Sequence, residues 1–188
     1  MPEELRPDLL SMTPDALRAA VSEHFASRGQ PAYRSGQVER WVFERLVQSV
    51  DEMTDLPADE RTALSKAFRI SEPEAQTIQR SKDGTIKHLW CLEDGELVES
   101  VLIPAKNRLT LCISSQAGCA MGCTFCATGW GGFDRQLTAG EIVSQYRASR
   151  RWAEENNYGP ISNIVYMGMG EPLSNRKSVH PSLTILNG

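Results

Sequence analysis

Apolar side chains recur at helical spacing near the start of the chain. Leu17, Val21 and Phe25 are spaced to line one face of a helix. The segment 13–15 (Thr-Pro-Asp) supplies an N-cap, a proline at the first helical position and an early acid, and Gly29 follows as the expected stop. The pattern predicts a helix between these two signals.

Two further apolar stripes, over residues 38–50 and after the segment 56–57 (Leu-Pro), also predict helices. Aromatic residues at this spacing usually pack in a core, so we expect Trp41 and Phe43 to be core residues rather than a ligand platform. The three stripes together predict a helical accessory domain over residues 1–72. The apolar positions are Val38, Trp41, Val42, Leu46, Val47 and Val50 in the second stripe and Leu64, Ala67 and Phe68 in the third.

The apolar period changes from that of a helix to that of a strand at Glu74. Asp-Gly pairs at 83–84 and 94–95 are turn signals between short alternating segments. They predict a small antiparallel meander that connects two larger regions over residues 73–107.

Glu99 is unusual in the last strand of this meander. It alternates with Leu97, Val101 and Ile103 onto one face, which places a carboxylate among aliphatic neighbours. Two interpretations are open at this point: a glutamate at the solvent edge of a strand, or a carboxylate with a function.

The remainder of the chain follows the order strand, loop, helix, strand. Residues 108–114 alternate and predict a strand, Thr138 and Glu141 match a capping box, and the segment 163–172 (NIVYMGMGEP) predicts a short buried strand that runs into a glycine turn. This order predicts a right-handed βαβ unit, in which the carboxyl ends of parallel strands meet at one edge. A last helix is expected near the end of the sequence, although Pro181 weakens that prediction.

Composition is that of a soluble globular α/β protein, with 188 residues that are 40% hydrophobic and 23% charged. No apolar run approaches the roughly 18 residues of a membrane span, and no basic-then-apolar leader begins the chain, so we expect a cytoplasmic protein without membrane contact. The net charge of −4 gives no overall reason to expect nucleic acid. A local cluster of Arg147, Arg150 and Arg151 suggests either a solvated helix face or a phosphate contact.

Three of the five cysteines, Cys119, Cys123 and Cys126, lie within an uncharged, glycine-rich loop, SSQAGCAMGCTFCATGWGGF. A structural zinc site takes four ligands, and His24, His88 and His180 are not at ligand spacing from this group. A cubane iron–sulfur cluster held by three thiolates keeps one iron without a protein ligand, where a cofactor can bind. The loop therefore predicts a [4Fe-4S] cluster with an open corner.

The spacing CxxxCxxC, with Phe125 before the last cysteine, resembles the signature of the radical S-adenosylmethionine superfamily. In such enzymes S-adenosylmethionine binds the open iron and is cleaved to a carbon radical by one electron. The segment GMGEP then looks like the superfamily's cofactor-binding turn, and the resemblance implies that Gly170 and Glu171 contact S-adenosylmethionine. It also implies the opening strands of a (β/α) partial barrel over residues 108–188.

Four segments in order resemble one family more closely, the dual-specificity adenine-C2 methyltransferases of 23S ribosomal RNA and transfer RNA. An amidine-like ring carbon is a poor nucleophile, which explains the need for radical chemistry in that family. The resemblance implies RNA substrates, an electron donor such as flavodoxin and a monomeric enzyme. The segments are GQPAYRSGQVERWVFERLVQSVDEMTDLP, LVESVLIP, RLTLCISSQAGCAMGCTFCATG and VYMGMGEPL.

The same resemblance assigns roles to single residues. Glu99 matches the family's proton acceptor, and Cys112 matches the cysteine that forms a transient disulfide with a methyl-carrying cysteine. By itself, Cys112 reads equally well as a small buried apolar residue, and Cys91 has no family role and is expected to be structural. The helical domain is expected to grip RNA, with phosphate contacts from Arg34, Arg40, Arg45 and the cluster near Arg150.

The methyl-carrying cysteine has no counterpart, because no cysteine follows Cys126. A complete barrel takes on the order of 200 residues, more than remain after Arg108. We therefore expect a fragment or truncated product that fails to methylate RNA alone. Two alternatives stay open: a methyltransferase acting at adenine C8, as in antibiotic resistance, and a non-catalytic metal protein that binds RNA.

Overall fold

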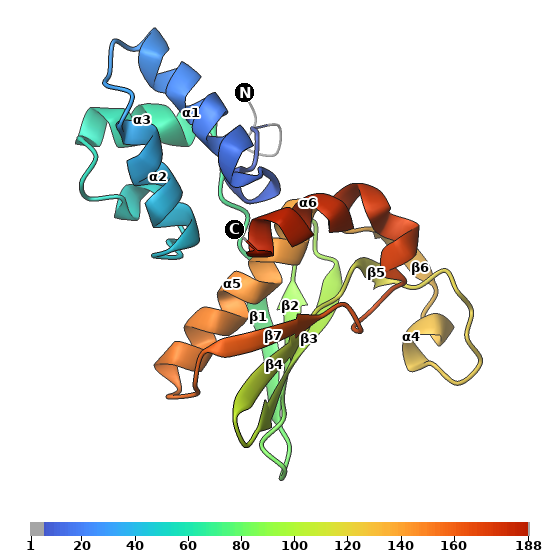
Figure 1. Cartoon of the computed structure of the whole chain (residues 1–188). Coiled ribbons are helices and arrows are strands. Elements are labelled where there is room, and N and C mark those ends of the chain that lie inside the picture. Colours follow the sequence, from blue (N-terminus) through green and yellow to red (C-terminus); the bar gives the residue numbers. More distant parts are fainter. Residues whose placement is uncertain (1–5, 188) are drawn as a thin grey trace.

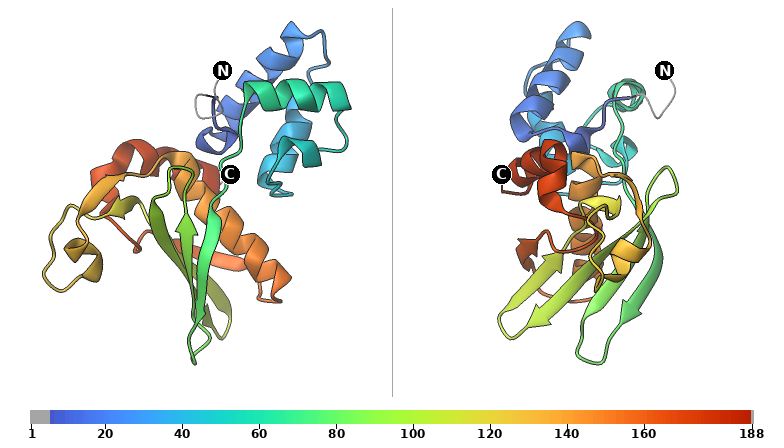
Figure 2. Two further views of the ribbon diagram at one scale, coloured as in Figure 1. Left: turned by 180° about the vertical axis from the view of Figure 1, so that it is seen from behind. Right: turned by 90° about the vertical axis from the view of Figure 1, so that its right-hand side faces the viewer.

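The computed structural model describes residues 6–187 as a helical N-terminal domain that sits above a twisted five-stranded sheet (Figure 1). Two helices, α5 (Ala139–Glu155) and α6 (Arg176–Asn187), pack on one face of that sheet. The opposite face carries no helix, as Figure 2 shows from two further directions. The mixed α/β fold predicted from the sequence is confirmed.

The N-terminal domain consists of α1 (Pro14–Ser27), α2 (Arg34–Phe43), α3 (Ala58–Ala67) and short 3-10 turns η2 (Leu9–Ser11) and η3 (Val50–Glu52). The predicted start and end of the first helix are confirmed. Thr13 accepts a hydrogen bond from the Ala16 N–H, Pro14 stands at the first position, and Gly29 adopts a φ of +68° after the helix. Trp41 is 8% exposed and belongs to the core, as predicted.

The second helix is shorter than the apolar stripe predicts. It ends at Phe43, and Leu46 then takes a positive φ of 53°, which turns the chain back so that Leu46 and Val47 are still buried. Val50 begins the short turn η3, which Ser49 and Glu52 close as a capping box. The apolar positions are therefore in the core, but only the first half of the stripe is helical.

The sheet has the strand order β1-β2-β3-β4-β7. The strands β1 to β4 pair with one another antiparallel, as the predicted meander requires, and β4 pairs with β7 in parallel. The meander thus continues into the same sheet as the βαβ unit. The strands are β1 (Glu74–Arg80), β2 (Ile86–Cys91), β3 (Leu97–Ala105), β4 (Arg108–Cys112) and β7 (Ile161–Val165), and a separate hairpin joins β5 (Gln116–Gly118) to β6 (Phe133–Gln136).

The structure bears on the two interpretations of Glu99 and corrects the predicted burial of β7. Glu99 lies on the more exposed face of β3, in line with the solvent-edge interpretation, because α5 and α6 cover Val98 and Leu102 on the other side. The strand β7 is half exposed rather than buried, since it lies at the edge of the sheet. Alternation identifies which residues share a face, and only the packing of the helices decides which face is covered.

The connection between β4 and β7 follows the predicted order. Thr138 and Glu141 form the expected capping box at the start of α5. After β7, Glu171 caps a short 3-10 helix η4 (Pro172–Asn175), which leads into α6. Pro181 lies inside α6, so the proline does not prevent this helix from forming.

The N-terminal domain is fastened to α5 by buried ionic contacts. Arg147 is 1% exposed and donates to the Glu72 carboxylate at 2.7 Å and to the backbone carbonyls of Val42 and Val47. Arg151 binds the other Glu72 oxygen at 2.6 Å. Both interpretations of the arginine cluster, a solvated face and an RNA contact, are therefore wrong for Arg147 and Arg151, and only Arg150 remains at the surface, paired with Glu154.

His88 on β2 produces a testable pH dependence. It is fully buried against Trp90 and Trp152, and neither ring nitrogen has a hydrogen-bond partner among residues 6–187. Burial lowers the pKa of His88 to about 4. Because the unfolded chain takes up this proton near pH ~6.5, stability is complete above that pH and falls as the pH drops toward 4, by roughly 3 kcal/mol.

We expect His88→Phe to weaken this acid dependence, measured as the urea midpoint at pH 7 and pH 4.5. Burial also lowers the pKa of His24, so part of the dependence should persist. His180 is exposed on α6, and His180→Gln is the matched control that should leave it intact. An acid dependence equal in His88→Phe and the unaltered protein would contradict the assignment.

Candidate functional site

The carboxyl ends of the parallel strands β4 and β7 lie side by side, and the segments that follow them are joined by hydrogen bonds. The Gly168 N–H donates to the Ile113 carbonyl at 3.0 Å, and the N–H groups of Ser115 and Gln116 both donate to the Met169 carbonyl. The Glu171 N–H donates to the Gln116 side chain at 2.8 Å. The glycine turn (residues 168–172) and the base of the cysteine loop thus form one unit, as expected.

Two glycines make this close approach possible. A Cβ on Gly168 would lie 2.7 Å from the Ser114 hydroxyl and 2.8 Å from the Ile113 backbone. Gly170 has a φ of +94°, and a Cβ there would lie 2.5 Å from the side chain of Gln116. The turn therefore requires glycine at both positions for its contact with the end of β4.

The cysteine loop (residues 119–132) is closed at its base by the β5–β6 hairpin. Gly118 has a φ of +70°, and the Cys119 N–H donates to the Gly132 carbonyl at 2.7 Å. The loop carries the short helix α4 (Ala127–Trp130) and projects from the body of the protein in Figure 1 and in the left view of Figure 2. The β5–β6 hairpin thus holds the three thiols on a single loop, and the base of that loop adjoins the glycine turn.

Cys119, Cys123 and Cys126 are free, half-buried thiols in this loop. Backbone N–H groups of Gly129 and Thr128 lower the pKa of the Cys126 thiol, which favours the thiolate that binds metals. No three His, Cys, Asp or Glu side chains among the described residues are gathered around a single ion. In a cubane cluster each thiolate binds a different iron atom, so three cysteines of one loop can serve three of its four corners.

The donor set therefore fits an iron–sulfur cluster with three protein ligands. Glu171 and Gly170 lie in the adjoining turn, where the Glu171 carboxylate accepts a hydrogen bond from the Leu173 N–H at 2.9 Å. That bond uses one carboxylate oxygen and fixes the side chain as the cap of η4. The second oxygen has no protein partner assigned to it within residues 6–187 and is suited to bind an ammonium group.

Glu99 and Cys112 share the helix-free face of the sheet. Cys112 is directly opposite Val101, and Glu99 is two residues from Val101 on the same side of β3. The Glu99 carboxylate is 37% exposed and forms an ion pair with Lys87 at 2.8 Å, so the expected apolar surroundings are not found. Burial raises the pKa of the Cys112 thiol, and the Met167 N–H opposes that shift.

The arginines expected to contact phosphate lie in the N-terminal domain, away from the sheet edge. Arg34 and Arg45 stack over Tyr33 and Trp41, at 5.8 and 4.1 Å from the ring centroids, and Arg40 is exposed. The sequence analysis also gave no role to several polar residues that assemble the site, because their partners are far away in the sequence. These are Lys87, Ser114, Gln116 and Asn175, the last of which donates to the Ser115 and Leu137 carbonyls.

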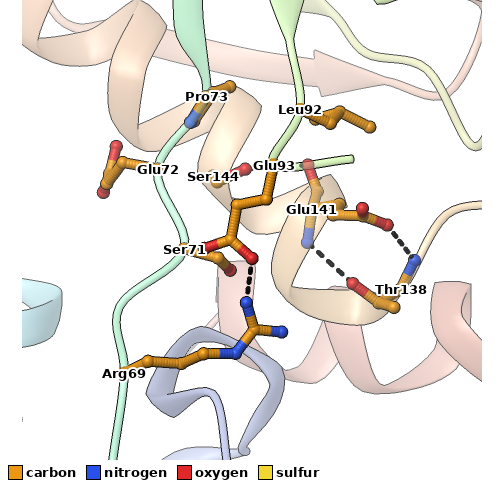
Figure 3. Close-up of a pocket in the computed structure, with 9 residues that line it drawn as sticks. All are labelled: Arg69, Ser71, Glu72, Pro73, Leu92, Glu93, Thr138, Glu141 and Ser144. Atoms are coloured by element: carbon orange, nitrogen blue, oxygen red, sulfur yellow. Dashed lines mark hydrogen bonds and ion pairs between the residues drawn. The ribbon is translucent and has the colours of Figure 1, made fainter. Parts of the chain in front are cut away.

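A small cavity of about 40 Å³ lies between the end of the N-terminal domain, the turn after β2 and the start of α5 (Figure 3). Arg69 pairs with Glu93 across it, and the Thr138–Glu141 capping box forms another wall. It is close to the size of one or two water molecules, and none of its lining residues belongs to the cysteine loop or the glycine turn. This cavity is part of the domain seam and not a cofactor site.

Comparison with protein families places the N-terminal domain in a known group. Residues 8–70 match the family described as the ribosomal RNA large subunit methyltransferase N-terminal domain. The chain is 51% identical over 181 residues to a probable dual-specificity RNA methyltransferase of Gemmatimonas aurantiaca, covering 96% of this chain and 49% of that protein. It is 48% identical to a dual-specificity RNA methyltransferase of an Anaeromyxobacter species, with similar coverage.

A solved structure supports the same relationship. The crystal structure of a radical SAM methyltransferase from Sphaerobacter thermophilus matches with a TM-score of 0.86 and 38% identity, over 97% of this chain and 52% of that one. The chain therefore spans about half the length of the relatives it matches. Within residues 6–187 no helix has both the length and the apolar character to cross a membrane. The family resemblance expected from the motifs is confirmed.

Proposed function

We propose that this chain, a homologue of the dual-specificity RNA methyltransferases over 96% of its length, forms the cofactor-binding part of a radical S-adenosylmethionine enzyme that methylates RNA. The names of the relatives support the reaction and the substrate class, and the solved neighbour supports the cofactor class. The finer proposal is methylation of adenine C2 in 23S ribosomal RNA and transfer RNA through a methylated cysteine. It rests on the sequence motifs.

Cys119, Cys123 and Cys126 would hold a [4Fe-4S] cluster, and Gly170 and Glu171 would bind the amino group of S-adenosylmethionine. When both groups are bound, the cluster would supply one electron to the sulfonium of S-adenosylmethionine, and cleavage of a carbon–sulfur bond would yield a primary carbon radical. The protein contributes position, because Gln116 and Met169 fix the glycine turn against the base of the cysteine loop. Segment 114–133 contains no charged residue, so no carboxylate of this segment competes with the thiolates for iron.

Glu99 and Cys112 have proton-handling roles in this proposal. Glu99 would accept a proton at the carboxylate oxygen that Lys87 now contacts. The raised pKa of Cys112 keeps its sulfur protonated at neutral pH, so that it attacks only after a base removes that proton. The target would be the sulfur of the methyl-carrying cysteine in the protein–RNA adduct: the S–S bond would form as the S–C bond of the adduct breaks, and the electron pair of that bond would leave with the carbon. All five cysteines are free in the structure, and the transient disulfide remains part of the proposal.

One observation carries the proposal: the hydrogen-bonded junction between the glycine turn and the base of the cysteine loop at the carboxyl ends of β4 and β7. In parallel α/β folds ligands bind at this edge of the sheet. Two motifs 40 or more positions apart in the chain meet there, within reach of the face that carries Glu99 and Cys112.

Anaerobic reconstitution with iron and sulfide tests the proposal. We expect about four iron atoms per chain and, after chemical reduction, cleavage of S-adenosylmethionine to 5′-deoxyadenosine. Cys123→Ser should lose most of the iron and all of the cleavage, because one thiolate ligand is gone. Cys91 lies outside the loop, so Cys91→Ser is the matched control and should keep both the iron and the cleavage activity. A zinc-loaded, colourless protein that leaves the nucleotide intact would instead support a non-catalytic RNA-binding protein.

The position of methylation needs a separate measurement. Mass spectrometry of nucleosides separates 2-methyladenosine from 8-methyladenosine in RNA treated with a full-length form of the enzyme. The present chain alone, in which no cysteine follows Cys126, is expected to yield neither. Detection of the 8-methyl product would move the proposal to the antibiotic-resistance type of enzyme.

A further inference from the structure

Trp130 is a large aromatic side chain left almost entirely in solvent. It ends α4 at the outer part of the cysteine loop and is 76% exposed, whereas Trp41 and Trp90 are buried and Trp152 is half-buried. The loop that carries it projects from the body of the protein (Figures 1 and 2). Tryptophan is highly buried in most proteins, so a ring exposed to this degree points to a partner.

The indole is held in place although it is exposed. Its N–H donates to the Thr124 carbonyl at 3.2 Å, and the Gly131 N–H donates to the Thr128 carbonyl at the same distance. The Gly129 N–H donates in turn to the Cys126 carbonyl at 3.0 Å. One edge of the ring is thus hydrogen-bonded to the loop. Because the side chain is already partly ordered, it loses less conformational entropy when a partner binds.

The surroundings of Trp130 are apolar and uncharged. The segment 114–133 contains no Asp, Glu, Lys or Arg, so it offers nothing to a phosphate or to a charged peptide. Both the cysteine loop with its hairpin and the segment around the glycine turn carry large exposed apolar side chains. They are Met121, Phe125, Trp130, Phe133, Met167 and Leu173.

We propose that Trp130 is a stacking platform for an unpaired nucleobase of the substrate RNA next to the reacting adenine. The inference rests on the proposed function, which brings RNA to this edge. A nucleobase has an apolar π-face that matches an exposed indole, and it needs no charge from the protein for this contact. Bases inside a duplex present no free face, so the platform selects single-stranded loops or bulges.

Stacking of one base on an aromatic ring contributes about 1–3 kcal/mol, which corresponds to roughly 5- to 150-fold in affinity. We expect Trp130→Ala to weaken binding of an RNA hairpin with an unpaired adenosine loop within this range. Trp130→Phe should retain most of the affinity, because the ring face is preserved. Met121→Ala removes a neighbouring exposed apolar side chain from the same loop and is the control, expected to change binding little.

Fluorescence of the chain gives a second readout that needs no catalysis. Trp130 is the most exposed of the four tryptophans, so base stacking should quench emission in the unaltered protein and much less in Trp130→Ala. A fully paired duplex of the same composition should quench weakly. These titrations use the protein after anaerobic reconstitution.

The outcomes separate the inference from the proposed function. Equal hairpin affinity in Trp130→Ala and the unaltered protein, or binding without quenching, overturns the stacking role while nucleotide cleavage stands. Loss of both RNA binding and nucleotide cleavage in the unaltered protein overturns the proposed function with it. If an added peptide quenched the Trp130 emission and RNA did not, the indole would be a protein-binding residue, and the inference would be overturned.

Discussion

Glu72→Ala is expected to lower the free energy of unfolding by about 3–5 kcal/mol, the usual cost of breaking a buried ion pair. The substitution leaves the Arg147 guanidinium, 1% exposed, with only backbone carbonyls as partners. Burial already lowers the pKa of Arg147, and the Glu72 charge is the largest effect opposing this. The measurement is urea denaturation followed by circular dichroism.

The matched control is Glu154→Ala, which removes the partner of Arg150 at the exposed surface of the same helix. Exposed pairs of this kind contribute little, so we expect a change within about 0.5 kcal/mol. Similar urea midpoints for the two variants would show that Arg147 and Glu72 do not join the domains in solution. Because the pair bridges the two parts of the chain, Glu72→Ala should also separate their unfolding transitions.

Gly168→Ala is expected to abolish nucleotide cleavage by the reconstituted protein and to destabilise it by about 1–3 kcal/mol, the usual cost of overpacking. The new Cβ would lie 2.8 Å from the backbone of Ile113, which directly follows β4 and donates its N–H to the Val165 carbonyl, so it has little freedom to move. The turn must then shift, with loss of the hydrogen bond from Gly168 to Ile113. Product analysis by chromatography and thermal unfolding measure the two effects.

Gly36→Ala is the control for the loss of a glycine. Gly36 lies inside α2, and a Cβ there would meet nothing within 4 Å. We expect it to stabilise the protein by about 0.4–1 kcal/mol, because alanine loses less entropy in a helix. Retained cleavage in Gly168→Ala would mean that the turn need not touch the end of β4 to bind the cofactor.

Local signals in the sequence predicted the parts of the fold that depend on local chemistry. Thr13 and Gly29 mark the start and the end of α1, because capping and a positive φ are properties of single residues. The end of α2 was not predictable in this way. Leu46 adopts a positive φ and is buried, and its carbonyl accepts a hydrogen bond from Arg151, a residue far along the chain.

Non-local partners explain the other misses. Arg147 and Glu72 are 75 positions apart, so a charge cluster read along the chain gives no sign that it is buried. The meeting of the cysteine loop and the glycine turn at one edge of the sheet was predictable because strand order alone brings two carboxyl ends together. Ser114 and Gln116 join these two segments, but their partners are 55 positions away, so only the structure shows this role.

The helix α5 is connected to the cysteine loop through its first turn and to the helical domain through its middle. Its first turn follows the hairpin that closes the cysteine loop, and its middle is locked by Arg147 to the helical domain. The helical domain is therefore held at a set distance and orientation from the edge of the sheet where the cysteine loop and the glycine turn meet. Any molecule that contacted both places at once would have to match this spacing.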